Sequence, residues 1–548
     1  MSSIKNILFI MFDQLRFDYL SCSGHPTLST PNIDRFARKA TRFTRAYVQS
    51  PICGSSRMSF YTGRYVHSHG ALGNGFPLKV GEMTLGDHLR ANGMDAFLLG
   101  KTHMVADVRG MERLGITPDS IIGVRASECG FDAVIRDDGL WPETDSDAED
   151  KDRGPYNEYL KKKGYPGASP WSQNANAGVT ETSEMASGWF MEHANLPANV
   201  MEEDSETPWL TSRCIEFLEK KRAVSARPFL AHLSYIKPHW PYIVPAPYHD
   251  MYSREDVIPA RRSERERVDP HPVYGEYMKM RVSRNFARDE VRERVIPAYM
   301  GLIKQCDDQM GRLFGYLEES GQMESTMIVL TSDHGDYLGD HWLGEKNLFH
   351  ECSVKVPMIV YDPRPQADAM RGLVSDMLVE SIDLAATFVD VVAEEVPDHI
   401  LEGRSLVPLL RGEKPAEWRQ VVVSEMEYSR SPVLKALDVK PRDARIFMVA
   451  DERWKLVHFE GGFPPLLFDL EADPDEFDDL ASDPSHKDKL DELYTHLSSW
   501  SRRMSQRTAL SDGDIEDAKK RSLHERGIFI GVYSEDEVDP KLLTKLKA

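Results

Sequence analysis

The sequence contains no long hydrophobic run. Near its start, the apolar run of residues 7–12 is only six residues long and is ended by Asp13. Such a run is too short for the core of a signal peptide and far too short to span a bilayer. No later stretch approaches spanning length. We therefore expect a cytoplasmic protein with no membrane partner.

Closely spaced cysteines and basic runs are also absent. The six cysteines are dispersed without paired spacing, so we expect reduced thiols and no disulfide framework. The formal net charge is -21, and no long run of Lys and Arg interrupts the acidic background. This charge argues against nucleic acid as a partner. A small anionic substrate would need a local pocket of positive charge.

The pattern of apolar residues predicts an α/β fold. Continuous apolar runs at residues 6–12 and 95–100 are typical of strands buried on both faces of a sheet, and helical patterns lie between them at 30–40 and 84–93. This alternation predicts a mostly parallel central sheet flanked by helices. Further strands are expected at residues 228–235, 326–331 and 357–361, and further helices at 211–221, 296–317 and 382–392.

Three later stretches depart from this alternation. Residues 107–208 are rich in Asp, Glu, Gly, Pro and Asn, and we expect a long irregular insertion or lid there. A second irregular stretch is expected at 243–290. After about residue 425, short alternating strands predict a small antiparallel sheet, followed by a helix near 486–503.

The length of 548 residues implies more than one domain, because a single hydrophobic core usually stops growing at about 250–300 residues. We predict a catalytic α/β domain over residues 1–425 and a C-terminal α+β subdomain over 426–548. The last stretch, from Arg526, is expected to be an extended tail that needs a surface to pack on. A neighbouring subunit would provide one, so we expect a homo-oligomer.

Two pairs of polar residues follow predicted buried strands. Asp13 and Gln14 come after the first strand, and Asp333 and His334 come after the strand at 326–331. An Asp at a strand end is most often a cap or turn residue, but two such pairs at the ligand-binding edge of an α/β sheet indicate a metal site. Because an imidazole suits Mn, Fe or Zn better than Ca, we favour one Mn(II) ion, with Ca and Zn as alternatives.

The segment 51–57 reads PICGSSR and is followed by Thr62-Gly63-Arg64. Its residues alone allow a helix start with a buried cysteine, or a Cys53 thiol that attacks a substrate directly. Cys53, a small residue two places later and Arg57 four places later resemble the signature of formylglycine-dependent sulfatases. These enzymes form the arylsulfatase and phosphonate monoester hydrolase branch of the alkaline phosphatase superfamily.

The resemblance implies an alkaline-phosphatase-like fold and a modified nucleophile at the metal ion. A formylglycine-generating enzyme would oxidise Cys53 to formylglycine, and a hydroxyl of the hydrated aldehyde would attack the ester. Arg57, one helical turn from Cys53, would lie on the same face and hold the developing oxyanion. The family places Asp-Asp and Asp-Asn or Asp-His at its metal, so Gln14 and His334 match the variant shared with phosphonate monoester hydrolases.

Four further residues match the family's clamp for the substrate anion. Lys101 and His103 lie two residues apart, which puts them on the same side of an extended segment. His239 lies in a Lys-Pro-His-Trp-Pro segment, and Lys346 follows the second metal pair. By resemblance, all four contact the non-bridging oxygens, and His239 or Lys346 protonates the leaving oxygen. Each alone would more often be an exposed lysine or a structural histidine.

These residues predict a metal-dependent sulfatase of the arylsulfatase type, acting on small anionic esters. Gln14 and His334 favour the alternative of a phosphonate monoester or phosphodiester hydrolase, whereas Lys101 and His103 favour sulfate. We therefore predict a sulfuric ester hydrolase that also accepts phosphonate monoesters and phosphodiesters. A third alternative is a catalytically inactive binding protein in which Cys53 is never converted. Asn74 is a candidate amide donor near the site, and His341, His350 and Glu351 are expected to be structural.

Overall fold

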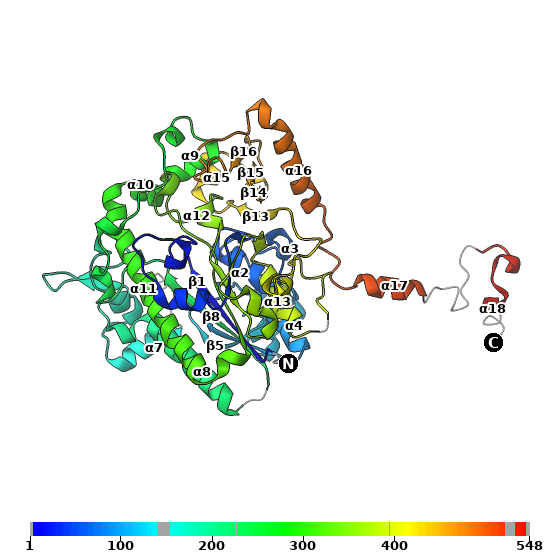
Figure 1. Cartoon of the computed structure of the whole chain (residues 1–548), viewed down its shortest axis with the longest axis horizontal. Coiled ribbons are helices and arrows are strands. Elements are labelled where there is room, and N and C mark those ends of the chain that lie inside the picture. Colours follow the sequence, from blue (N-terminus) through cyan, green and yellow to red (C-terminus); the bar gives the residue numbers. More distant parts are fainter. Residues whose placement is uncertain (1–3, 140–153, 225–226, 394, 521–531, 544–548) are drawn as a thin grey trace.

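An eight-stranded sheet forms the centre of the protein, with strand order β11-β2-β10-β9-β1-β8-β4-β5. The computed structural model describes residues 4–139, 154–224, 227–393, 395–520 and 532–543. Helices cover the central sheet, and a second, smaller sheet lies beside it (Figure 1). The arrangement confirms the predicted α/β architecture.

The central strands run parallel, as predicted. β1 (Asn6–Asp13) lies between β9 (Thr326–Ser332) and β8 (Phe229–Pro238), and β4 (Asp95–Gly100) continues the sheet beyond β8. The other strands are β5 (Asp132–Arg136), parallel to β4; β10 (Met358–Tyr361), antiparallel to its two neighbours; β2 (Thr41–Phe43); and β11 (Val374–Ser375).

The apolar run of β1 contributes side chains to both hydrophobic cores of the large domain. Its alternate residues enter two different hydrophobic clusters, because successive side chains of a strand point to opposite faces. Ile7, Phe9 and Met11 belong to one cluster, and Leu8, Ile10 and Phe12 belong to the other. The first cluster includes side chains of α2 (Cys53–Thr62), α4 (Leu85–Ala91) and α13 (Asp383–Asp390). The second includes side chains of α1 (Pro31–Ala37), α8 (Glu206–Val224) and α11 (Asp289–Glu319).

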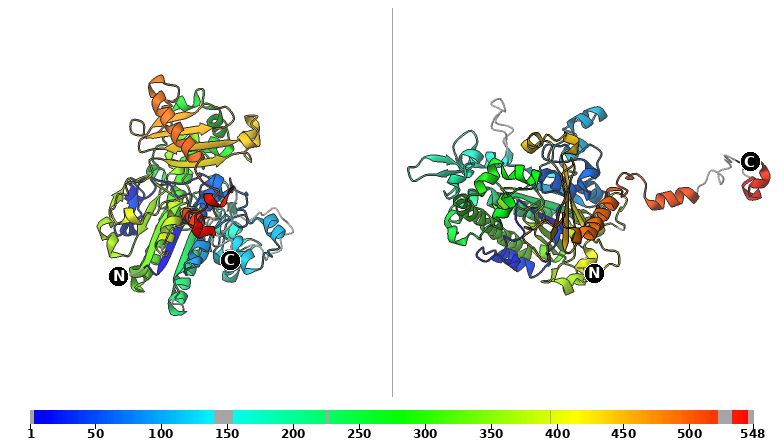
Figure 2. Two further views of the ribbon diagram at one scale, coloured as in Figure 1. Left: turned by 90° about the vertical axis from the view of Figure 1, so that its right-hand side faces the viewer. Right: turned by 90° about the horizontal axis from the view of Figure 1, so that it is seen from above.

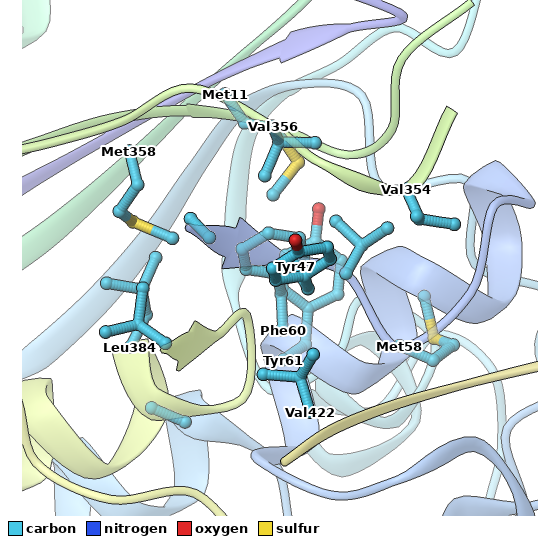
Figure 3. Packing of buried hydrophobic residues seen from close by; sticks show 14 of the residues in the cluster. Met11, Tyr47, Met58, Phe60, Tyr61, Val354, Val356, Met358, Leu384 and Val422 are labelled. Carbon is cyan, nitrogen blue, oxygen red and sulfur yellow. The ribbon is translucent and has the colours of Figure 1, made fainter. Parts of the chain in front are cut away.

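Helix α2 is enclosed by the protein on all sides. All ten of its residues are buried, and its Met58, Phe60 and Tyr61 lie among Val356, Met358 and other apolar side chains (Figure 3). A helix without a solvent-facing side is held by packing along its whole length, and close-packed interiors leave little freedom for side-chain movement. The first residue of this helix, Cys53, is therefore firmly placed.

The expectation of irregular structure at residues 107–208 is wrong. Within the described part of this insertion, β5 forms the edge of the central sheet next to β4. The segment also contains α5 (Val108–Leu114), α6 (Ile121–Ala126), α7 (Gly154–Lys163), β6 (Ala177–Val179) and β7 (Met185–Ser187). Such elements are shorter than the windows in which periodicity can be recognised. The stretch at 243–290 likewise contains α9 (Pro272–Met278) and α10 (Arg281–Phe286).

The C-terminal part forms the predicted small antiparallel sheet. Its strands, in order, are β13 (Val422–Glu427), β14 (Arg445–Ala450), β15 (Trp454–Phe459) and β16 (Leu466–Asp469). Helix α16 (Lys487–Ser501) packs on this sheet through Leu493 and Leu497. The predicted domain boundary at residue 425 falls inside β13.

Beyond α16 the chain leaves the body of the molecule. Helix α17 (Asp512–Lys520) lies to one side of both sheets in Figure 1 and in the second view of Figure 2. Of the tail expected from Arg526, the structure describes only residues 532–543, with the short α18 (Pro540–Leu543). Among all described helices, none is both long and apolar enough to cross a membrane.

Candidate active site and metal centre

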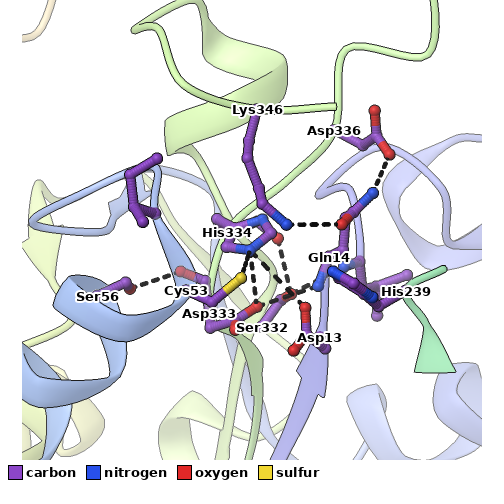
Figure 4. Close-up of polar contacts among 12 residues, drawn as sticks. Asp13, Gln14, Cys53, Ser56, His239, Ser332, Asp333, His334, Asp336 and Lys346 are labelled. Atoms are coloured by element: carbon purple, nitrogen blue, oxygen red, sulfur yellow. Dashed lines mark hydrogen bonds and ion pairs between the residues drawn. The ribbon is translucent and has the colours of Figure 1, made fainter. Parts of the chain in front are cut away.

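The ends of β1 and β9 bring the two predicted metal pairs together. The strands are parallel neighbours, with Phe12 opposite Ser332, so the residues that follow each strand lie at the same edge. Asp13, Asp333, His334 and Cys53 each place one ligand atom so that all four atoms lie within 4.8 Å of one another. Figure 4 shows these side chains converging from β1, β9 and the start of α2.

Cys53 lies inside this cluster, with its Sγ atom 3.0 Å from His334 Nε2. Burial alone would raise the pKa of the Cys53 thiol. The charges of Lys346 and His334 and hydrogen bonds from His103 and His239 instead hold this pKa well below its ordinary value. Residue 53 thus occupies a buried site of positive potential, which is the environment that an anionic substrate needs.

Arg57 points to the carboxylates behind Cys53. Its Nε atom donates to Asp333 Oδ2 at 2.7 Å, and its Nη2 atom donates to Asp13 Oδ2 at 3.2 Å. The remaining hydrogen bonds of this fully buried guanidinium go to Tyr61, Ser234 and the carbonyl of Lys101. Arg57 therefore positions both acidic ligands, while its contact with the oxyanion stays a prediction.

Lys101 and His103 reach the same centre by a different geometry from the one expected. His103 has a φ of 56°, so the segment turns and is not extended. Lys101 Nζ lies 2.6 Å from Asp13 Oδ2, and His103 lies near enough to Cys53 to lower the pKa of its thiol. The turn is held by Asp138, whose Oδ1 atom accepts from the backbone N–H groups of Thr102 and His103, both at 3.0 Å.

His239 and Lys346 also lie close to Cys53 (Figure 4). His239 helps to lower the pKa of the thiol, and its Nδ1 atom lies 3.2 Å from the carbonyl oxygen of Trp240. Lys346 Nζ donates to Gln14 Oε1 at 3.0 Å. Burial alone would lower the pKa of Lys346, but the negative charge assigned to Cys53 raises it, so this side chain stays cationic. All ten predicted site residues therefore lie in one cluster.

Comparison with known proteins identifies the family. The sulfatase family model matches residues 5–393, and a model described as the C-terminal part of N-sulphoglucosamine sulphohydrolase matches residues 339–503. The chain belongs to the sulfatase family. This confirms the family predicted from the segment at Cys53.

Relatives of this sulfatase-family protein carry several names. It is 31% identical over 527 residues to the multifunctional alkaline phosphatase superfamily protein PehA of Trinickia caryophylli, covering 90% of this chain and 95% of that protein. It is 27% identical over 506 residues to an arylsulfatase of Clostridium perfringens, covering 89% and 92%. The solved phosphonate monoester hydrolase SpPMH of Silicibacter pomeroyi has a TM-score of 0.79 and 29% identity, covering 92% and 97%.

The ligand set of this sulfatase-family protein fits a divalent metal ion. Asp13 Oδ1 is buried and has no hydrogen-bond partner among the described residues. An unpartnered carboxylate oxygen is costly in a protein interior, and a cation at this point would remove that cost. Asp13, Asp333 and His334 supply two carboxylates and an imidazole, and Gln14 adds an amide.

Three residues that support the site were not singled out from the sequence. Asp336 accepts hydrogen bonds from Gln14 Nε2 and from Tyr242 Oη, the latter at 2.6 Å, and thereby orients the Gln14 amide. The third residue is Asp138, described above. The position of Asp336, three residues after Asp333 and next to Gly335, is the only sequence signal for it.

The other candidates lie around this centre. Asn74 Oδ1 accepts from the backbone N–H of Gly54 at 2.8 Å, so Asn74 holds the start of α2 as an acceptor and not as the expected donor. His341 and His350 stack on each other with ring centroids 3.6 Å apart, and Glu351 pairs with Lys455 at 2.8 Å. These last three residues therefore have structural contacts, as expected.

Proposed function

We propose that this protein is a metal-dependent hydrolase of sulfate monoesters whose nucleophile is derived from Cys53. The observation that carries this proposal is the position of Cys53, buried within reach of two carboxylates and an imidazole and faced by Lys346. An ordinary core cysteine has apolar surroundings, and burial then raises its pKa, as it does for Cys214. The family and its arylsulfatase relatives support the same assignment.

The chain's own residues account for binding and proton transfer. Lys101 and Lys346 carry the positive charge that binds a sulfate group, and the buried site keeps bulk water away. A divalent ion held by Asp13, Gln14, Asp333 and His334 would supply Lewis-acid activation. We assign to His239 or Lys346 the proton that the leaving oxygen needs when the sulfur–oxygen bond breaks.

Formylglycine completes the cycle in this proposal. One hydroxyl of the hydrated aldehyde at residue 53 attacks the sulfur atom, and the alcohol leaves with its proton. The second hydroxyl then loses its proton, the carbon–oxygen bond to sulfate breaks, and the aldehyde forms again. A neutral base is needed for this last proton, and we assign this role to His103, which lies near residue 53. Maturation by a formylglycine-generating enzyme, a cytoplasmic location and a homo-oligomeric state are further parts of the proposal.

The alternative is hydrolysis of phosphonate monoesters at the same site, which the Gln14 and His334 pair and the similarity to SpPMH support. We expect turnover of both ester classes, because both present a monoanionic group, with sulfate preferred because the Lys101 and His103 pair matches the sulfatase pattern. The measurement is kcat/KM for an aryl sulfate and an aryl phosphonate monoester of the same phenol. If the protein hydrolyses the phosphonate and leaves the sulfate unchanged, it is a phosphonate monoester hydrolase and not a sulfatase.

Metal analysis tests the proposed ion. The imidazole of His334 among the ligands favours Mn(II) or another first-row divalent ion over calcium. We expect manganese to restore activity after chelation, and calcium to restore much less. Purified protein that contains one calcium ion per chain and is fully active would show this choice to be wrong.

A further inference from the structure

A cavity of about 670 Å³ lies where four parts of the chain meet. The insertion contributes Trp189 and Met191, the loop after β8 contributes Trp240, the region of α9 and α10 contributes Arg281, and α15 (Pro432–Ala436) contributes Val433. Figure 1 shows α9, α10 and α15 side by side, next to the C-terminal sheet. Ligand sites commonly lie at such junctions and have volumes in this range.

One residue of the cavity wall, Trp240, is linked to the reaction centre by sequence and by packing. Trp240 directly follows His239, to which we assign the proton of the leaving oxygen. Its indole ring packs on the ring of Tyr242, with centroids 4.4 Å apart. The hydroxyl of Tyr242 in turn accepts from Gln14 Nε2 at 2.8 Å. Two contacts, from Trp240 to Tyr242 and from Tyr242 to Gln14, therefore join the cavity wall to the reaction centre.

The cavity is larger than a simple phenol requires. An apolar cavity of about 150 Å³ is enough to hold benzene, so one ring would leave most of this space empty. The indole rings of Trp189 and Trp240, with Met191, offer apolar surface for a second ring. Aromatic side chains pack well on flat ring systems. The cavity therefore suits a leaving group of at least two fused rings or of similar size.

One wall of the cavity carries a positive charge. Lys279 is paired with Glu276 at 2.5 Å, whereas Arg281 has no ion pair within the part of the chain that the structure describes. A guanidinium without a partner beside apolar surface favours a carboxylate or sulfonate on the ligand. The protein as a whole has a net charge of -21 and repels anions, so this local cation favours binding of an anionic ligand at this wall.

We propose that this cavity binds the leaving group of the ester, and that this group is a bulky aromatic alcohol with an acidic substituent. The inference rests on the proposed function. It assigns Trp189, Trp240 and Arg281 to substrate selection, with the two indoles contacting the rings and Arg281 contacting the acidic group.

Sulfate esters of phenol, 2-naphthol and a carboxylated 2-naphthol test the proposal. We expect kcat/KM to rise at least about tenfold from the phenyl to the naphthyl ester. Trp189→Ala should lower that ratio by about tenfold. Arg281→Gln should lower the ratio between the carboxylated and plain naphthyl esters by about fivefold. Arg281 is exposed, so its replacement leaves the fold intact.

Two neighbouring residues provide matched controls. Phe190 is 62% exposed and Arg284 is an exposed residue of α10; neither lines the cavity. Phe190→Ala and Arg284→Gln should leave both ratios unchanged. Equal ratios in Trp189→Ala, Arg281→Gln and the controls would overturn the assignment of the cavity, even if all three esters are hydrolysed.

Binding of the free carboxylated naphthol, measured by calorimetry, tests the cavity without turnover. We expect binding that weakens in Arg281→Gln and Trp189→Ala and is unchanged in the two controls. If the free carboxylated naphthol does not bind the protein without substitutions, the proposal is refuted. If the naphthol binds in this way but no sulfate or phosphonate ester is hydrolysed, the cavity assignment stands and the proposed function fails.

Discussion

Replacing Cys53 by alanine should lower kcat/KM for an aryl sulfate by about 10⁴-fold or more. Removal of a covalent nucleophile has effects of this size, because the remaining groups can bind the substrate but have nothing to attack it with. The substitution removes one atom from a site formed by Asp13, Asp333 and His334. The protein should still fold and bind a metal ion, which distinguishes loss of chemistry from loss of structure.

Mass spectrometry of the peptide that contains Cys53 adds a direct test of its conversion. In active protein this peptide should be lighter by the difference between a thiol and an aldehyde. Cys306→Ala is the control for Cys53→Ala and should keep the activity. Cys306 is also buried but lies in α11, and burial raises the pKa of its thiol. A fully active preparation with an unmodified thiol at residue 53 would disprove the formylglycine mechanism.

Replacing Arg57 by alanine should reduce both activity and stability. The substitution leaves Asp13 and Asp333 without the buried guanidinium that pairs with both of them. Breaking such a buried pair typically costs about 3–5 kcal/mol. Burial alone would raise the pKa of Asp13; Lys101 and then His239 and Arg57 hold it below its ordinary value. We expect a lower unfolding midpoint and weaker metal binding, and excess metal should recover part of the stability.

Arg419 provides the matched control for this experiment. It is another arginine that pairs with two carboxylates, those of Glu380 and Asp383, at a place outside the metal cluster, and its side chain is 6% exposed. Arg419→Ala should lower stability by a similar amount, while the folded protein keeps its metal affinity. If Arg57→Ala and Arg419→Ala have the same metal affinity as the unmodified protein, Arg57 does not position the ligands.

Local sequence patterns were sufficient to locate most of the site. Asp13 directly follows an apolar run, and Asp333 follows another after Thr331 and Ser332; a continuous apolar run predicts a strand in a helix-covered sheet. Parallel strands place the residues after their carboxyl ends at one edge, so the meeting of Asp13 and Asp333 followed from the order of elements. The short segment around Cys53 predicted the family, because it combines several residue types at fixed spacing.

Other features depended on contacts that spacing cannot reveal. Asp138 lies in the insertion, where β5 was missed because it is short, yet its carboxylate holds the turn at His103. The prediction of an extended segment from Lys101 to His103 failed because that turn depends on Asp138. Asp336 is held in place by a hydrogen bond from Tyr242, which lies in the loop after β8.

The sequence by itself therefore determined the family and the α/β fold and was enough to predict the metal ligands and the nucleophile, since each prediction starts from a short segment with a recognisable pattern. Only the tertiary structure decided that Arg57 faces the ligand carboxylates and that a large cavity lies beside Trp240. Both depend on side chains from distant segments, whose relative positions are set by packing of the whole domain and not by local preference.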